Sequence, residues 1–392
     1  MSQEPLVTAF KELNTAEKTS IIELNNSLPK SDFRDEEDTS GSASVTDTDS
    51  EFQVTHSTAG DFARFTSSSR GRYVPGKIAE AGIGIRAGSS LPTSGDYTAK
   101  WGYFEMDPNN SETIENGALF GHDSQGFFLE VIRAQDSNII RPGDFNEVRS
   151  TNIDFTQGHI FQIQFGYYGY LPIRFQYLDK KYLGSEDEES KTVNLHTHIP
   201  EQETSLTNTN LKVGTVIDSS TGTGSFDLFV GGRQFNIIGE FRPRTRKTNA
   251  SVNNVNVADA DDWVPVLSFK KKQSFREIPV DYNTTIVRSN QNVAVRILRQ
   301  PTLDQSTFGS IDRIPDSETA VEKDTSATST SNGRKVDEFL VDGGKSNNSA
   351  GQAFKDVTLP VDLVDEGIFT IEVNADGSDA TVDAVASVIE QW

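Results

Sequence analysis

The sequence predicts an all-β protein made of two β-sandwich domains in tandem, preceded by an N-terminal arm. The chain has 392 residues, of which only 34% are hydrophobic, and its 30 Gly and 14 Pro are spread along its length. This composition is typical of β-rich domains with many turns. Over residues 51–245, apolar and polar residues alternate in short segments, and apolar residues do not recur at helical spacing. A polar stretch at 246–262 then separates two series of such segments, as a domain boundary does.

The first fifty residues are expected to lie outside the sandwiches. Residues 3–28 fit a short helix or an extended arm. Residues 31–50, SDFRDEEDTSGSASVTDTDS, are acidic and small and are typical of a linker or surface loop. We therefore assign residues 1–50 to an N-terminal arm and acidic linker.

Residues 51–245 contain twelve short segments with the length and alternation of strands, from EFQVTH to RQFNIIG. In RQFNIIG, for example, Phe235 and Ile237 share one face. Twelve strands of this length make a two-sheet sandwich.

One of these segments, GHIFQIQFGYYGYLPIRFQYL at 158–178, holds four of the nine tyrosines. Alternation of apolar and polar residues on both sides of the glycines predicts a β-hairpin. The residues expected in the core are Phe161, Ile163, Phe165, Ile173 and Phe175. At the tip, Tyr167, Tyr168 and Tyr170 each offer a flat ring and a hydroxyl. They are candidates for contact with a glycan or a neighbouring subunit, and packing at the rim of the sandwich is the alternative.

The second strand series fills residues 263–392, with residues 246–262 as the linker before it. We assign 263–392 to a C-terminal, jelly-roll-like β-sandwich. The segment IFTIEVNADGSDATVDAVASVI at 368–389 is expected to be a β-hairpin that turns at ADGSDA. Phe369, Ile371 and Val373 would then face one core.

The net charge of −22 argues against a nucleic-acid partner, because phosphate binding needs clustered cations. Such acidity also suits a protein that works at high salt. Residues 233–299 reverse the sign, with 12 bases against 6 acids. The basic belt in this region comprises Arg242, Arg244, Arg246, Lys247, Lys270, Lys271 and Lys272. It either is neutralised within the chain or meets an acidic surface of a neighbouring copy.

No residues are assigned to catalysis, a cofactor or a metal. The chain has no cysteine, no nucleotide-binding glycine motif and no G-x-S-x-G motif. The paired carboxylates of sandwich glycosidases, spaced as E-x-D-x-x-E, are absent from the sequence. His196 and His198 lie two apart on an expected strand, but no third ligand is apparent. No membrane span or secretory signal is predicted.

Several segments, taken in order, resemble structural proteins of tailed viruses. They include VTAFKELNTAEKTSIIELN, RYVPGK, WGYF, GFFLEVIR, the hairpin segment, LHTHI, IGEFRPRTR, PVLSFKKKQSFREIPV, VAVRILRQPTL and VEKDTSATSTSNGRK. The resemblance covers nearly the whole chain and implies a concanavalin A- or laminin G-like sandwich followed by a smaller β-domain.

The resemblance also implies a non-enzymatic component of the virion exterior, such as a turret, spike, fibre or baseplate part. Its expected partners are further copies of itself, as a trimer or pentamer, other virion proteins and a host-surface glycan. The acidity is consistent with a virus of a salt-loving archaeon. The alternatives are a cellular lectin-like carbohydrate-binding module and a polysaccharide-degrading enzyme on the same fold.

Overall fold

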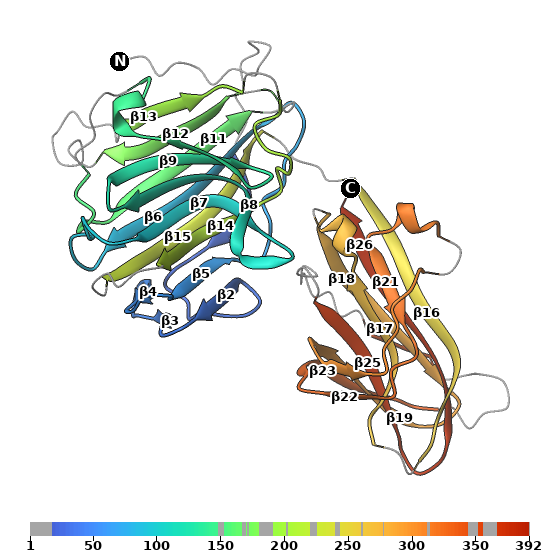
Figure 1. Cartoon of the computed structure of the whole chain (residues 1–392). Coiled ribbons are helices and arrows are strands. Elements are labelled where there is room, and N and C mark those ends of the chain that lie inside the picture. Colours follow the sequence, from blue (N-terminus) through green and yellow to red (C-terminus); the bar gives the residue numbers. More distant parts are fainter. Residues whose placement is uncertain are drawn as a thin grey trace, which may run out of the picture. The chain divides into compact units, whose positions relative to one another are not determined.

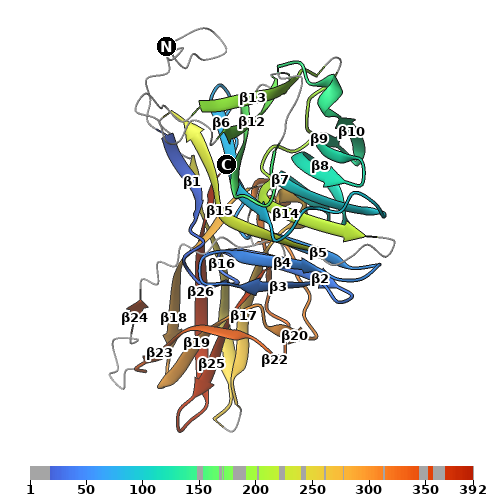
Figure 2. The same ribbon diagram turned by 90° about the vertical axis from the view of Figure 1, so that its left-hand side faces the viewer.

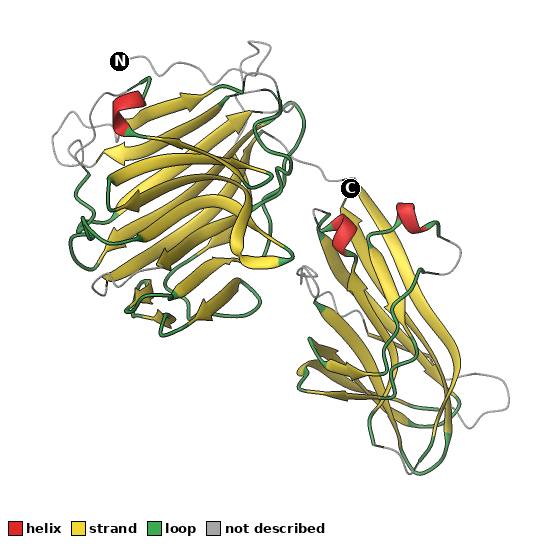
Figure 3. Ribbon diagram, in the orientation of Figure 1, coloured by secondary structure: helices red, strands yellow, loops and turns green. Residues whose placement is uncertain are grey.

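The computed structural model describes residues 18–147, 153–166, 170, 172–179, 191–200, 203–219, 226–239, 244–259, 262–276, 278–311, 314–343, 352–355 and 367–391. The chain forms two compact units, Met1–Arg242 and Pro243–Trp392. Strands dominate both, and the described helices are single 3-10 turns at Pro142–Asp144, Gln273–Phe275 and Asp316–Glu318 (Figure 3). The predicted all-β class is confirmed.

The first unit is a sandwich of two antiparallel sheets (Figure 1). The eight-stranded sheet has the order β13 (Lys191–His198), β12 (Ile173–Asp179), β11 (His159–Gly166), β6 (Ile78–Ala87), β15 (Phe226–Ile238), β4 (Phe52–His56) and β3 (Ser44–Asp47), and β1 (Lys18–Leu24) also pairs with β15. The seven-stranded sheet has the order β10 (Asp136–Ile140), β9 (Gly126–Arg133), β8 (Asn110–Asp123), β7 (Tyr97–Asp107), β14 (Lys212–Ser219), β5 (Phe62–Ser67) and β2 (Asp35–Ser40).

Aromatic side chains from both sheets fill the core between them. Trp101 on β7 packs against Phe161 on β11 with ring centroids 5.2 Å apart, and Tyr103 stacks on Phe235 of β15 at 5.1 Å. The predicted hairpin is formed by β11 and β12, with Phe161 opposite Tyr177 and Ile163 opposite Phe175. All five side chains that the alternation assigned to the core of this hairpin are buried.

Asp61 forms hydrogen bonds that link two connecting segments at one end of the first sandwich. Its Oδ2 accepts hydrogen bonds from the backbone N–H groups of Ser57 (2.9 Å) and Thr58 (2.8 Å), and its Oδ1 accepts one from Ser42 (2.7 Å). Burial by itself raises the pKa of Asp61, but these hydrogen bonds outweigh burial and hold the pKa below its usual range. The turn between β2 and β3 is thus tied to the connection between β4 and β5.

We expect Asp61→Asn to reduce the free energy of unfolding at neutral pH by about 1–3 kcal/mol, because an amide nitrogen cannot accept the N–H groups that bind the carboxylate. Since the folded pKa is depressed, the stabilisation is present above the unfolded pKa of about 3.9 and is lost as pH falls below it. The free energy of unfolding, measured with urea, should therefore decrease less between neutral pH and about pH 3 in Asp61→Asn than in the wild type. Asp218→Asn, at an exposed carboxylate on β14, is the control and should behave as the wild type. If acidification lowered the free energy of unfolding equally in Asp61→Asn and in the wild type, this account would be contradicted.

The assignment of residues 1–50 to an arm and linker is wrong for the described part. Residues 18–50 contain β1, β2 and β3, and Figure 2 shows β1 beside β15. Charge composition misled the prediction, because the acids of β2 are paired with cations of the sandwich. Glu36 binds Arg64 at 2.9 Å and also Lys212, and Asp35 binds Arg233. Residues 1–17 lie outside the described chain.

The second unit is also a two-sheet sandwich. One sheet has the order β16 (Thr245–Val257), β26 (Ala380–Gln391), β18 (Val280–Ser289) and β24 (Gln352–Lys355). The other has the order β21 (Val321–Asp324), β17 (Val264–Lys271), β25 (Ile368–Ala375), β19 (Val293–Arg299) and β23 (Arg334–Val341). Tyr282 of the first sheet stacks on Phe369 of the second, with ring centroids 5.4 Å apart.

These two sheets have the strand order of a jelly roll. With β16, β17, β18, β19, β23, β24, β25 and β26 taken as first to eighth, one sheet runs first, eighth, third, sixth and the other second, seventh, fourth, fifth. That is the arrangement of a jelly roll, whose eight strands form two Greek keys. The added strand β21 and the ribbon of β20 (Thr302–Asp304) and β22 (Ser329–Ser331) lie between β19 and β23 in the chain.

Two sequence predictions for this unit are wrong. Residues 246–262 are not a linker, because most of them belong to β16, a long strand paired with β26. Its buried residues are Thr248, Ala250 and Val257, so the strand lacks the Phe, Ile and Leu side chains that would reveal it. The expected hairpin at 368–389 is not formed either. Phe369, Ile371 and Val373 are buried as predicted, but β25 and β26 belong to different sheets.

Candidate ligand-binding face

Of the three tyrosines predicted at the tip between β11 and β12, the structure describes Tyr170. Tyr170 has 66% of its surface exposed, and its ring is therefore available for contact. Tyr167 and Tyr168 lie outside the described residues. The three tyrosine rings are therefore not placed relative to one another.

The predicted basic belt does not form one surface. Lys271 and Lys272 are buried, and Lys272 donates to Oδ1 of Asp316 at 2.6 Å. Lys270 pairs with Glu322 at 3.3 Å, and Arg246 pairs with Glu318. Arg244 and Lys247 are exposed, and Arg242 lies outside the described residues. Neutralisation within the chain, the first of the two interpretations, therefore accounts for three of the seven positions: Arg246, Lys270 and Lys272.

The described part of the chain contains no group of three His, Asp or Glu side chains with the spacing of a metal site. His196 lies next to Phe145, and burial lowers the pKa of both His196 and His198. None of the described helices has the length and apolar character needed to cross a membrane.

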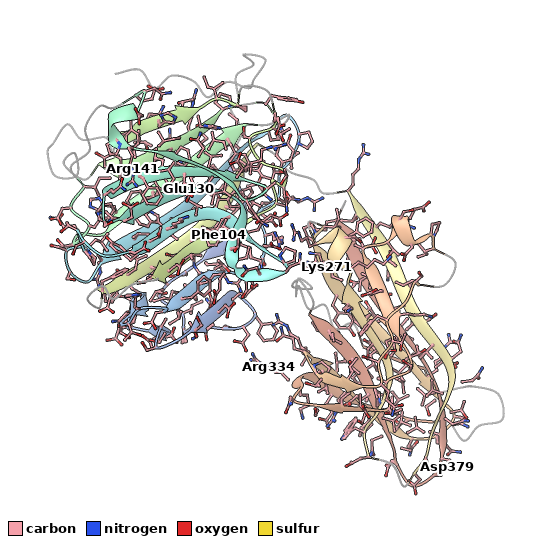
Figure 4. The ribbon with its side chains drawn as sticks, in the orientation of Figure 1. Phe104, Glu130, Arg141, Lys271, Arg334 and Asp379 are labelled. Carbon is pink, nitrogen blue, oxygen red and sulfur yellow. The ribbon has the colours of Figure 1, made fainter. Side chains whose placement is uncertain are left out.

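On the outer face of the seven-stranded sheet, the charged groups bind one another. Arg141 donates to both carboxylate oxygens of Asp123, at 2.9 and 2.6 Å, and its guanidinium lies 5.0 Å from the ring centroid of Phe128. Lys100 on β7 reaches Glu130 on β9 at 2.7 Å. Figure 4 labels Glu130 on β9 and Arg141, which directly follows β10. Asp123 and Glu130 on this face are thus each paired with a cation.

The outer face of the eight-stranded sheet is different, because neutral amides cross it in one row. Asn194 of β13 lies opposite Gln176 of β12, which lies opposite Gln162 of β11. Gln162 lies opposite Gly82 of β6, and Gly82 lies opposite Gln234 of β15. We call Asn194, Gln176, Gln162 and Gln234 the amide row.

The members of the amide row point away from the core, because the residues that flank them are buried. Phe161 and Ile163 flank Gln162, and Arg233 and Phe235 flank Gln234. Gly82 leaves room in the row: an added Cβ there would lie 2.9 Å from Nε2 of Gln234. The side chain of Gln234 therefore lies across the backbone of Gly82, toward the middle of the sheet.

Among the described residues, two of the four amides have side chains without a hydrogen-bond partner. Gln176 donates from Nε2 to Oδ1 of Asn194 at 2.7 Å. Gln162 and Gln234 make no side-chain hydrogen bond to another described residue. Each carboxamide has two donor hydrogens and an acceptor oxygen, so the row offers uncharged donors and acceptors side by side.

Arg174, two residues before Gln176 on β12, is exposed on the same face, and two further cations there are held in ion pairs. Lys18 binds Glu80 at 2.7 Å, and Arg86 donates from Nε to both oxygens of Glu51, at 3.0 and 2.8 Å. Arg86 also lies over the ring of Phe229, 3.7 Å from its centroid. The amide row itself therefore offers hydrogen bonds without charge, with the exposed Arg174 beside it.

The sequence did not reveal this row. Alternation placed Gln162 and Gln164 on the polar side of a strand, but it gave no means of finding their neighbours. β6 and β15, which complete the row, lie about seventy residues away in opposite directions along the chain. A preference for glutamine at outward positions of adjacent strands is the one signal that could have suggested it.

No protein-family model and no curated protein sequence matches this chain. Its structure is similar to the carbohydrate recognition domain of Emp46p (10% identity, 56% of this chain and 97% of that chain, TM-score 0.37). It is also similar to arcelin-5, a lectin-like defense protein from Phaseolus vulgaris (12%, 57% and 99%, 0.35), and to peanut lectin (9%, 57% and 98%, 0.36). These are lectin and lectin-like sandwiches, the class expected for residues 51–245, and at such identities the similarity concerns the arrangement of strands alone.

Proposed function

We propose that this protein binds neutral glycans through the amide row on the outer face of its eight-stranded sheet, without changing them chemically. The observation that carries the proposal is the register of the row, which places three adjacent amides and a fourth beyond Gly82 on one face. Gln162 and Gln234, on either side of Gly82, make no side-chain hydrogen bond to another described residue.

The chemistry of a carboxamide matches that of a sugar hydroxyl. A hydroxyl donates one hydrogen bond and accepts two, and a carboxamide can satisfy both roles. Adjacent strands are about 4.8 Å apart, which is close to the length of one pyranose unit in an extended chain. A glycan that lies across the strands would therefore meet one amide per strand over β13, β12 and β11.

Charge selects a neutral glycan over an acidic one. The chain carries a net charge of −22, so a polyanion would be repelled over a distance set by the ionic strength. Equilibrium binding of the full chain to a soluble mannan, a soluble β-glucan and an alginate tests this preference. We expect binding to at least one neutral polymer and weaker binding to alginate, whereas preference for alginate would contradict the proposal.

Ion pairing of two carboxylates supports the proposal that the protein binds a glycan without hydrolysing it. On the outer face of the seven-stranded sheet, Asp123 and Glu130 are each held by a cation, whereas a glycosidase needs one carboxyl group protonated as the acid. Prolonged incubation with the bound polymer should leave the number of reducing ends unchanged. An increase in reducing ends would favour the polysaccharide-degrading alternative.

A single row of amides would bind weakly, and several copies acting together would bind far more strongly. We therefore propose that the protein functions as a homo-oligomer. The same principle would serve a cellular lectin-like module and a viral attachment protein equally well.

A second proposal concerns location: the protein is an exterior component of a tailed virus particle, in contact with other virion proteins. It is supported by the resemblance of the sequence segments and by the jelly-roll strand order of the second unit, an architecture used by viral capsid and lectin domains. Labelled antibodies against the chain, imaged on intact particles by electron microscopy, should decorate the exterior. Particles that lack the chain would contradict this proposal and leave the glycan-binding proposal standing.

A further inference from the structure

A strip that carries no polar side chain runs beside the amide row on the outer face of the eight-stranded sheet. It crosses three adjacent strands, β11, β6 and β15 (Figure 1). Ile160 of β11 lies opposite Gly84 of β6. On β15, Gly231 and Gly232 together face Gly84 across a shift in register, and a Cβ added at Gly84 would lie 3.6 Å from the Cα of Gly231. We call Ile160, Gly84, Gly231 and Gly232 the glycine strip.

The fold does not require glycine at the three glycine positions of this strip. None of the three has a positive φ. A Cβ added at any of them would find its nearest neighbour at 3.6–3.7 Å, which is ordinary van der Waals contact. Packing does require glycine elsewhere in the unit, because a Cβ at Gly121 would overlap the ring of Phe128 and one at Gly214 would overlap the backbone of β5. Glycine weakens a strand and often marks a place that a ligand approaches closely.

Larger side chains stand on both sides of the glycine strip. On one side are Gln162 and Gln234 of the amide row. On the other side Arg86 lies opposite Phe229 and over its ring, 3.7 Å from the centroid. Gly82, in the amide row, and Arg86 are four residues apart on β6, which is about 13 Å along a strand. Between these two rows the strip therefore leaves a width of bare backbone that accommodates one pyranose ring.

The apolar end of the glycine strip is accessible. Ile160 is 47% exposed. Leu178 of β12 is partly exposed and faces the same side, because its neighbour Tyr177 packs against the core. A sugar ring has hydroxyls at its edge and C–H groups on its two faces. The amide row matches the hydroxyl edge, and the strip beside it matches a C–H face, because apolar surfaces are driven together in water.

We infer that the glycine strip holds the C–H faces of consecutive pyranose rings while the amide row binds the hydroxyls at their edges, so that the glycan is a flat β-1,4-linked chain of glucose type. The inference rests on the proposed glycan-binding function and names the class of glycan.

The configuration of the ring decides whether it can lie on the strip. In a β-glucose unit every hydroxyl is equatorial, and both faces consist of C–H groups. Successive rings of a β-1,4-linked chain are turned by half a turn, so both faces meet the sheet in alternation. In mannose, hydroxyl 2 is axial and interrupts one face. On every second ring it would be pressed against the strip without a partner, and burying an unpaired hydroxyl is unfavourable.

The test titrates the full chain with cellotetraose and with β-1,4-mannotetraose, which differ only in the configuration at carbon 2 of each ring. We expect the wild type to bind cellotetraose at least about fivefold more tightly, because of the unpaired axial hydroxyl of mannose. Gly84→Gln places a side chain on the strip and should weaken the binding of cellotetraose at least about tenfold. Ile160→Ala removes apolar contact and should weaken it about threefold to tenfold.

Each variant has a matched control away from the strip. Gly143→Gln adds the same side chain at an exposed glycine with no neighbour within 4 Å. Ile139→Ala makes the same truncation on β10 of the other sheet, at a side chain that is 48% exposed. Both controls should bind as the wild type does, and circular dichroism should show all four variants folded.

The outcomes separate this inference from the proposed function. A wild type that binds no neutral glycan overturns both. A wild type that binds a neutral glycan without preferring cellotetraose overturns the inference alone, as does unchanged affinity in folded Gly84→Gln or Ile160→Ala. Equal loss of affinity in a variant and its control would also overturn the inference and leave glycan binding standing.

Discussion

Asp35→Ala is expected to lower the free energy of unfolding of the first unit by about 3–5 kcal/mol, the usual loss when one member of a buried ion pair is removed. Asp35 begins β2 in the seven-stranded sheet, and Arg233 lies on β15 in the eight-stranded sheet, so their contact joins the two sheets. The guanidinium of Arg233 is buried, with its central carbon 4.2 Å from the ring centroid of Phe65 and 5.5 Å from that of Phe52. Without Asp35, this charge would remain in an apolar setting, where desolvation already lowers the pKa of Arg233.

The measurement is urea unfolding followed by fluorescence of Trp101, the only tryptophan in the sequence of residues 1–242, in a background of Trp263→Phe and Trp392→Phe. The matched control is Asp35→Ala/Arg233→Met, which removes both charges and fills the space with an apolar side chain. This double variant should recover most of the loss, because replacement of a whole buried pair is often neutral or stabilising. A single variant within about 1 kcal/mol of the wild type would contradict the account, since even an unsatisfied buried polar group costs about 1–3 kcal/mol.

Phe161→Ala is expected to reduce the stability of the same unit by about 3–5 kcal/mol through loss of apolar contact and the cavity left behind. The ring of Phe161 is buried, with centroid distances of 4.9 Å to Phe120, 5.2 Å to Trp101 and 6.2 Å to Phe155. These partners come from β7 and β8 of the facing sheet and from the segment before β11, so no single side chain can move to fill the space.

Ile160→Ala provides the control on the adjacent position of β11. Ile160 points to the opposite face and is 47% exposed, so its truncation should change the free energy of unfolding by about 0.5 kcal/mol or less. Urea unfolding followed by far-ultraviolet circular dichroism compares the two variants and avoids the altered environment of Trp101. Equal losses in both variants would contradict the inward orientation of Phe161.

Structural features that depend on residues close together in the sequence were predicted correctly in the hairpin of β11 and β12. The hairpin of β11 and β12 follows from alternation on both sides of a short connection, and its buried face agrees residue by residue. Alternation alone does not say which sheet a strand joins. The segments that became β25 and β26 read as a hairpin, yet the chain crosses between sheets at this turn, because a short turn can join two strands of one sheet or of two facing sheets.

Strands that contain few large apolar residues were missed. The acids of β2 suggested a solvated linker, and they are instead bound by Arg233, Arg64 and Lys212, which come from distant parts of the chain. Similarly, β16 buries small residues at alternate positions and was taken for a boundary. The amide row could not be predicted for the same reason, since its register depends on pairing between strands far apart in sequence.

The most direct test of the central claim is the affinity of the Gln162→Ala/Gln234→Ala variant for the neutral polysaccharide that the wild type binds, measured by isothermal titration calorimetry. Each hydrogen bond lost is worth about 0.5–1.5 kcal/mol, so two lost bonds should weaken binding by about fivefold to a hundredfold, at about 1.4 kcal/mol per factor of ten. The matched control, Asn253→Ala/Asn256→Ala, removes two exposed carboxamides of β16 in the second unit and should bind as the wild type does. Glycan affinity that is unchanged in the Gln162→Ala/Gln234→Ala variant, with both variants folded, would contradict the claim that the amide row is the binding site.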